Sequence, residues 1–121
     1  MKNLKKYQIP LLIIIALVAI SLIIFFQNRP GMILFYSDSC PHCQNVNKYI
    51  NDNGLKDKLK FQELEVSQPQ NKTNAALLEK KARQCGLDVS QGLGVPFFFD
   101  GQKCLMGDQD IINYFQNTIK Q

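Results

Sequence analysis

An uninterrupted apolar segment near the N-terminus divides this chain into two parts. Residues 9–26 carry no charged side chain and consist almost wholly of Ile, Leu, Ala, Val and Phe. A helix over this segment would rise roughly 27 Å, close to the hydrocarbon thickness of a bilayer. The remaining residues are too few to bury a helix that is apolar on every face. The segment therefore predicts a single transmembrane helix and not a core helix.

The same segment favours a retained anchor over a cleaved signal peptide. A signal peptide has a shorter apolar region that ends at a small-residue cleavage site. Here the only small-x-small match is Ala19-Ile20-Ser21, and the apolar run continues beyond it to Phe26. No cysteine lies near that match for lipid attachment. We therefore expect the segment to remain as an anchor in the lipid bilayer.

Flanking charge predicts the orientation of this anchor. Lys2, Lys5 and Lys6 precede the span, whereas only Arg29 follows it closely. The positive-inside rule then keeps the basic N-terminus, residues 1–8, in the cytoplasm and places the rest of the chain outside. Disulfides form and persist in such extracytoplasmic compartments.

The formal net charge of +4 comes mostly from these lysines. The chain has no basic stripe interleaved with aromatic residues, so we expect no nucleic-acid partner.

The part of the chain after the anchor has room for one small domain. Residues 32–121 are enough for one hydrophobic core but not for two. Residues 27–31 form a short linker, which reaches at most about 18 Å when extended. The domain is therefore expected to work close to the membrane surface.

A pair of cysteines lies in the tetrad Cys40-Pro41-His42-Cys43, directly after a short apolar segment, Met32–Tyr36. Cysteines two residues apart can close a reversible disulfide, and a tetrad between a strand and a helix is typical of redox motifs. The free N–H groups and the dipole of a helix N-terminus stabilise a thiolate there. We therefore predict thiol–disulfide exchange, with Cys40 as the exposed nucleophile and Cys43 as the resolving thiol.

The two residues between the cysteines have separate expected roles. Pro41 fits the first turn of a helix, where its missing N–H is no loss. The imidazole of His42, protonated or hydrogen-bonding near Cys40, would favour the thiolate. A stabilised thiolate makes the corresponding disulfide a stronger oxidant. The alternative interpretation is that His42 is merely exposed and leaves Cys40 unaffected.

The order of elements expected after the linker is βαβ, then a helix, then ββα. Asp100-Gly101 is typical of a tight hairpin turn, and Asp108 can cap the final helix. The second strand is expected to run parallel to the first through the crossover helix. The expected elements are strands at Met32–Tyr36, 60–66, Phe97–Phe99 and 102–106, and helices at 44–53, 74–85 and 109–119.

This α/β pattern resembles the thioredoxin-like fold in its minimal, glutaredoxin-sized form, over residues 32–119. The tetrad after the first strand, Val95-Pro96 before the third strand and Gly107-Asp108 before the last helix carry the resemblance. The tetrad resembles that of DsbA-type disulfide oxidases. Followed by Gln44, it is also similar to thioredoxin-like domains found with vitamin K epoxide reductase homologues.

The resemblance has implications for the site around the cysteines. It implies that Pro96 is cis and packs against the active-site disulfide, and that the backbone of Val95 meets an extended substrate. It implies no cofactor beyond the redox-active disulfide Cys40–Cys43. Glutathione is a weaker alternative, because glutathione-using glutaredoxins tend to carry Gly-Gly where this chain has Met106-Gly107.

Two further cysteines, Cys85 and Cys104, leave three interpretations open. They could form a structural disulfide between the second helix and the fourth strand. They could be free, buried residues that act as small hydrophobes. They could also be a second redox pair that exchanges electrons with Cys40–Cys43. The sequence alone does not tell whether their Cα atoms lie within bridging range.

The leading functional hypothesis is a membrane-anchored, extracytoplasmic thiol–disulfide oxidoreductase, with the direction of electron flow left open. Its expected partners are exported thiol or disulfide proteins near the membrane and an integral membrane thiol oxidase or reductase. The alternative is a non-catalytic docking or metal-binding module in which Cys40 and Cys43 hold copper(I) or zinc. Zinc usually needs four ligands, and His42 is the only histidine, so no metal site is expected.

Overall fold

The computed structural model describes the backbone of residues 4–27 and 31–120, and the side chains of residues 9–24 and 31–120. The chain divides into two compact units, Met1–Pro30 and Gly31–Gln121.

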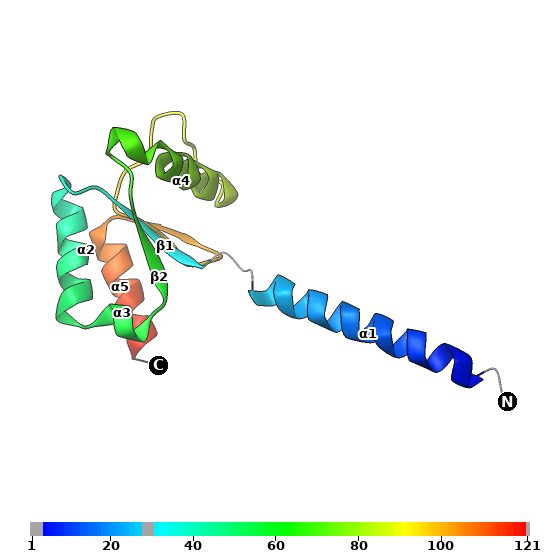
Figure 1. Cartoon of the computed structure of the whole chain (residues 1–121). Coiled ribbons are helices and arrows are strands. Elements are labelled where there is room, and N and C mark those ends of the chain that lie inside the picture. Colours follow the sequence, from blue (N-terminus) through cyan, green and yellow to red (C-terminus); the bar gives the residue numbers. More distant parts are fainter. Residues whose placement is uncertain (1–3, 28–30, 121) are drawn as a thin grey trace. The chain divides into compact units, whose positions relative to one another are not determined.

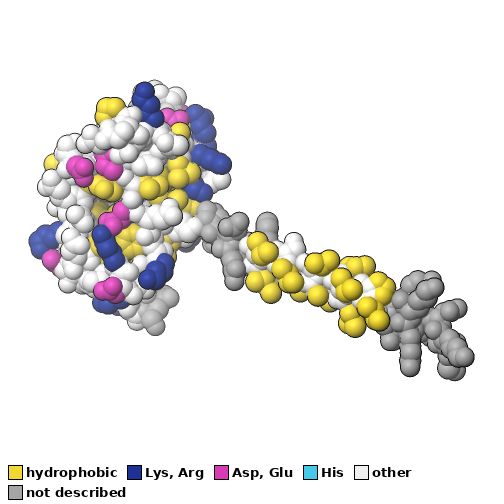
Figure 2. Space-filling model, in the orientation of Figure 1, with side chains coloured by type: hydrophobic (Ala, Val, Ile, Leu, Met, Phe, Trp, Pro, Cys, Tyr) yellow, Lys and Arg dark blue, Asp and Glu magenta, His cyan; other side chains and the backbone are white. Residues whose placement is uncertain are grey.

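The first unit contains one helix, α1, which runs from Leu4 to Gln27. Its large apolar side chains between Ile9 and Ile24 are more than half exposed, and they are visible on the face shown in Figure 2. Within the described residues, no helix is both long enough and apolar enough to cross a bilayer. The expected span at residues 9–26 therefore stays a prediction. Its flanking charges at Lys2 and Arg29 lie outside the described residues.

The second unit is built on a four-stranded mixed sheet in the order β2-β1-β3-β4. β1 is parallel to β2 and antiparallel to β3, and β3 is antiparallel to β4 (Figure 1). The parallel pairing of the first two strands is confirmed. The strands are β1 (Met32–Tyr36), β2 (Phe61–Glu65), β3 (Phe97–Phe99) and β4 (Cys104–Met106).

Helices cover both faces of this sheet (Figure 1). Leu34 of β1 packs into one cluster with residues of α2 and α5, whereas Ile33 and Phe35 pack into a second cluster with residues of α4. This explains the continuous apolar run of β1, since a strand that is covered on both faces has no polar side. The helices are α2 (Pro41–Asp52), α3 (Leu55–Lys58), α4 (Lys72–Gln84) and α5 (Asp108–Ile119), with a 3₁₀ turn, η1 (Pro69–Asn71), before α4.

Aromatic packing holds α5 against the sheet. Phe98 of β3 and Phe115 of α5 are fully buried, and their rings meet edge to face with centres 5.0 Å apart. Such pairs add to the stabilisation that comes from the buried area alone. The packing fixes α5, and so the residues at its first turn, relative to β3 and the loop before it.

Several expected boundaries differ from those observed. α2 begins at Pro41 and not at residue 44 as expected. The last three residues of the cysteine tetrad therefore already belong to this helix. The fourth strand is shorter than expected because residues 100–103 form the hairpin turn, in which Asp100 donates its N–H to the carbonyl oxygen of Lys103 at 3.0 Å. Helix α3 was not expected. It follows Gly54, whose positive φ of 58° favours glycine, and it buries Leu55.

The predicted capping role of Asp108 is wrong. Gly107 occupies the cap position, and Asp108 is the first residue of α5. A carboxylate at this position still interacts favourably with the helix dipole. Its side chain, however, contacts residues of α2, because the N-termini of α2 and α5 lie close together.

Candidate active site

Cys40 occupies the cap position of α2, with an extended backbone (φ −92°, ψ 117°). Its sulfur accepts a hydrogen bond from the backbone N–H of Cys43 at 3.3 Å. Its own N–H donates to the carbonyl oxygen of Ser37 at 3.2 Å, which anchors the residue to the end of β1. The sulfur thus takes the place of a capping oxygen, where free helix N–H groups favour a negative charge.

Cys43 lies one turn into α2 and is only 4% exposed. Burial, followed by the hydrogen bond with the Cys40 side chain, raises the pKa of Cys43 from 9.0 to about 12. Both thiols are free in this structure, and Cys40 is the more exposed of the two. This asymmetry fits an attacking thiol at the surface with a protonated partner behind it.

The loop before β3 lies beside Cys40. The peptide bond between Val95 and Pro96 is cis, as the resemblance implied, and Pro96 is fully buried. The thiol of Cys40 donates to the carbonyl oxygen of Val95 at 3.4 Å. The structure therefore brings Val95 and Pro96 together with the cysteine pair, although residue 95 is 55 positions away from Cys40 in the sequence.

His42 lies beside Asp108, which was expected only to cap the final helix. Nδ1 of His42 is 3.3 Å from Oδ2 of Asp108, and Asn45 donates to the same oxygen at 2.7 Å. Hydrogen bonds from Asn45 and then from His42 lower the pKa of Asp108 below 3.8. The Asp108 side chain is 12% exposed, whereas that of His42 is 69% exposed. A carboxylate therefore lies behind the imidazole, which faces solvent.

A polar network supports the loop between β1 and Cys40. Ser37 donates its hydroxyl to that of Ser67 at 3.0 Å, and Ser67 donates in turn to the Glu65 carboxylate. Burial alone would raise the pKa of Glu65, but hydrogen bonds from Ser67, Asn71 and Gln68 lower it from 4.5 to about 2. The ionised carboxylate thus links the end of β2 to the loop that positions Cys40.

A polar pocket of about 200 Å³ opens behind Cys43. It is lined in part by Tyr36 and Asn47, and by Lys56 and Glu63, whose charged groups pair at 2.5 Å. Among the described residues, no three side chains of His, Cys, Asp or Glu cluster as a metal site would need. Cys43 is also among the residues that line this pocket.

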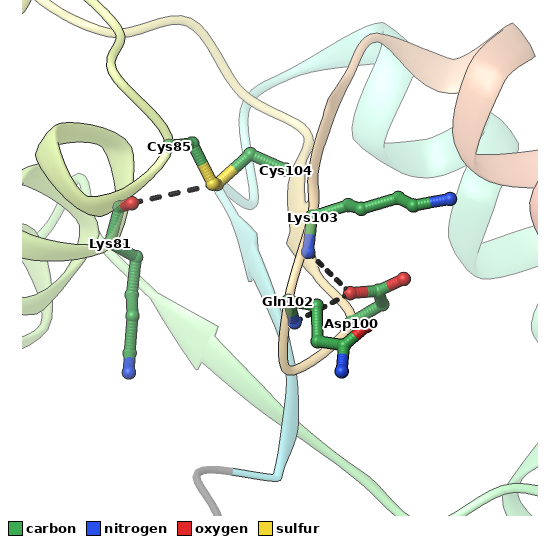
Figure 3. The surroundings of a disulfide bond; sticks show 6 residues. All are labelled: Lys81, Cys85, Asp100, Gln102, Lys103 and Cys104. Atoms are coloured by element: carbon green, nitrogen blue, oxygen red, sulfur yellow. Dashed lines mark hydrogen bonds between the residues drawn. A yellow bond between two sulfur atoms is a disulfide. The ribbon is translucent and has the colours of Figure 1, made fainter.

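The second cysteine pair is bonded in the structure. Cys85, just after α4, and Cys104, the first residue of β4, form a disulfide with their Cα atoms 6.1 Å apart (Figure 3). The sulfur of Cys104 also lies 3.5 Å from the carbonyl oxygen of Lys81. This structure therefore contains a disulfide between the two cysteines, and they are not free. It fastens the end of α4 to the edge of the sheet.

The contact of Asp108 with His42 and Asn45 and the network around Glu65 were not predicted from the sequence. Asp108 was singled out only for its position before a helix, a local signal that does not reveal a partner in α2. For Glu65 the available signal was an acidic residue near the end of the expected strand at 60–66. Neither pattern identifies the groups that surround the side chain in the folded domain.

No family model and no curated protein matches this chain. Among solved structures, reduced Escherichia coli glutaredoxin matches with a TM-score of 0.51 and 16% identity, over 76% of this chain and 100% of that one. Glutaredoxin 1 from Francisella tularensis, solved with cacodylate, matches with a TM-score of 0.50 and 13% identity, over 75% and 98%. At these identities the comparison shows the fold alone: the domain has a mixed α/β, thioredoxin-like fold.

Proposed function

We propose that this chain is a thiol–disulfide oxidoreductase that works through Cys40 and Cys43. The observation that carries the proposal is the hydrogen bond from the Cys43 N–H to the Cys40 sulfur, at the start of a helix on a thioredoxin-like fold. The arrangement places the Cys40 sulfur at the free N–H groups of a helix N-terminus and keeps a second thiol within one helical turn.

In the reducing direction, the Cys40 thiolate attacks a substrate disulfide. A bond forms between Cys40 and one substrate sulfur, and the other substrate sulfur leaves with the electron pair and takes up a proton. Cys43 then loses its proton and attacks the sulfur of Cys40, which releases the second substrate sulfur and leaves the Cys40–Cys43 disulfide. The oxidising direction reverses these steps, and the tetrad leans towards it by its resemblance to disulfide oxidases.

Substrate binding is proposed for the backbone of Val95 and Pro96. The carbonyl oxygen of Val95 already accepts from the Cys40 thiol. An extended substrate that forms main-chain hydrogen bonds with this loop would bring its own sulfur close to Cys40. Such contacts select little for side chains, which suits an enzyme that acts on many exported proteins. No cofactor beyond the disulfide is proposed, and glutathione remains the weaker alternative.

We further propose that residues 9–26 anchor the enzyme in a bilayer, with the domain outside the cytoplasm. The support is the length and apolar character of the segment and the excess of lysines before it. The Cys85–Cys104 disulfide adds support, because structural disulfides persist mainly in oxidising compartments. An integral membrane thiol oxidase or reductase would regenerate the domain.

Trapping of mixed disulfides tests the redox proposal. Full-length Cys43→Ser should accumulate disulfide-linked adducts with substrate proteins, because Cys40 can attack but no resolving thiol follows. The matched Cys40→Ser variant should trap none. If neither variant forms reducible adducts, and if either substitution instead removes stoichiometric copper(I) binding, the metal-binding alternative replaces the redox proposal.

A separate experiment tests the anchor. Full-length protein should stay with the membrane fraction after carbonate extraction, and a membrane-impermeant maleimide should label Cys40 in intact cells. The Cys40→Ser variant corrects for labelling of other thiols. Release by carbonate would contradict the anchor, and labelling only after lysis would contradict the orientation.

A further inference from the structure

We propose that Asp108 positions His42 so that its free Nε2 transfers protons to and from the substrate sulfur. The inference rests on the proposed redox function. It assigns His42 a chemical step in addition to any effect of its charge on Cys40.

The first observation is the contact at the buried side of the ring. Nδ1 of His42 lies 3.3 Å from Oδ2 of Asp108. An ionised carboxylate oxygen can only accept, so this contact favours a proton on Nδ1. The neutral ring then has its lone pair on Nε2. In histidine, the partner of one nitrogen decides which role the other nitrogen can take.

The second observation is that the carboxylate is itself held in place. Asn45 donates to the same oxygen at 2.7 Å, and the Asp108 side chain is only 12% exposed. The lowered pKa of Asp108 keeps it ionised at neutral pH. A fixed anion behind the ring sets its orientation and stabilises the charge that appears when Nε2 accepts a proton.

The third observation concerns location. Gly107, next to Asp108, donates its N–H to the carbonyl oxygen of Pro96 at 3.0 Å. Val95 in the same loop accepts from Cys40 at 3.4 Å. The start of α5, the loop that contains Val95 and Pro96, and the sulfur of Cys40 therefore adjoin one another. The side chain of His42, which contacts Asp108, is 69% exposed. A substrate sulfur arriving at Cys40 would come within the region that the ring can reach.

The chemistry is balanced in both directions. When the Cys40 thiolate breaks a substrate disulfide, the leaving sulfur carries away the electron pair and takes the proton from Nε2 of the charged ring. Solvent then reprotonates the ring. In the oxidising direction, a substrate thiol gives its proton to neutral Nε2 and attacks the sulfur of Cys40 as a thiolate. The Cys40–Cys43 bond breaks, and Cys43 leaves with the electron pair and takes up a proton from solvent. General acid–base help of this kind contributes typically about 10²–10⁴-fold to a rate.

The tautomer of His42 provides a spectroscopic test. Because the chain has a single histidine, the imidazole ¹⁵N signals of the full-length protein are unambiguous. In reduced wild type with a neutral ring, we expect the Nδ1–H form. Asp108→Ala should shift the ring to the Nε2–H form, whereas Asp110→Ala should not. Asp110 is a matched control, since it is an exposed carboxylate in the same first turn of α5.

Leaving-group dependence tests the proton transfer itself. Single-turnover rates are compared for bis(2-hydroxyethyl) disulfide, whose leaving sulfur needs a proton, and for 2,2′-dithiodipyridine, whose leaving sulfur does not. His42→Gln should lower the ratio of the first rate to the second by at least about 10²-fold, and Asp108→Ala should lower it in the same direction. His42 is exposed, so His42→Gln keeps the test valid even if Asp108→Ala unfolds. Asp110→Ala should leave the ratio unchanged.

The outcomes separate this inference from the function on which it rests. An Nε2–H ring in wild type would overturn the role of His42 and Asp108. So would equal losses of rate with both disulfides in the Asp108→Ala and His42→Gln variants, even though Cys40 still reacts. A wild-type protein that reacts with neither disulfide would overturn the proposed function, and this inference with it.

Discussion

The backbone N–H of Gly107 donates to the carbonyl oxygen of Pro96 at 3.0 Å, which ties the start of α5 to the loop beside Cys40. This hydrogen bond joins two segments that the sequence analysis had treated separately. Because α5 is also fixed by the packing of Phe115 against Phe98, its first turn is held at the edge of the site. The arrangement brings the Asp108 carboxylate from a distant part of the chain to the imidazole of His42, two residues after Cys40.

The two active-site thiols should differ strongly in reactivity. At pH 8, a pKa of about 12 leaves Cys43 almost wholly protonated, and each pKa unit above the pH reduces the thiolate about tenfold. We expect iodoacetamide to modify Cys40 at least about tenfold faster than Cys43, as measured by mass spectrometry of the folded, reduced tetrad.

Cys40→Ser is the control for this difference, because it leaves Cys43 as the only free cysteine. In this variant Cys43 should react slowly in the folded protein and rapidly in denaturant. Similar rates for both thiols in the folded wild type would contradict the burial of Cys43.

The Glu65 carboxylate should make the domain sensitive to acid. Its pKa of about 2 in the folded state lies below its ordinary 4.5, so the unfolded chain binds the proton first as the pH falls. Its stabilising contribution is therefore present above about pH 4.5 and is lost between pH 4.5 and 2. The free energy of unfolding of Glu65→Gln, measured with denaturant, should change less across this pH window than that of wild type.

Glu79→Gln is the matched control, because Glu79 is an exposed carboxylate on α4. The free energy of unfolding of Glu79→Gln should show the same pH dependence as that of wild type. An identical acid dependence of Glu65→Gln and wild type would show that the hydrogen bonds from Ser67 and Asn71 do not hold the ionised form.

Removal of the Cys85–Cys104 disulfide should lower stability without removing thiol exchange. The bond closes a loop with a sequence separation of 19 residues, for which chain entropy gives a contribution of about 3 kcal/mol. The double variant Cys85→Ser/Cys104→Ser should therefore lose about this much free energy of unfolding.

The same double variant tests whether this pair exchanges electrons with Cys40–Cys43. A structural bond predicts that exchange with small disulfides continues at the wild-type rate, measured below the lowered melting temperature. Loss of multiple-turnover exchange with retention of the first turnover would instead indicate a second redox pair.

Much of the fold could be predicted because its signals are local. The apolar run of β1 and the helical spacing after Pro41 reflect side chains that each element must bury on its own. Two features could not be predicted in this way. The Asp108 carboxylate finds Asn45 across 63 residues, and whether Cys85 bonds to Cys104 depends on a Cα separation of 6.1 Å. Both follow from how whole elements pack, which no local pattern encodes.

The most direct test of the account is the equilibrium reduction potential of Cys40–Cys43 in the full-length chain, measured in glutathione redox buffers by the extent of thiol alkylation. The account predicts one two-electron transition that both Cys40→Ser and Cys43→Ser abolish. A potential near −120 mV would identify a disulfide donor, and one near −270 mV would identify a reductant. A tetrad that remains two free thiols across the whole range would contradict the central claim that these cysteines form a redox-active disulfide.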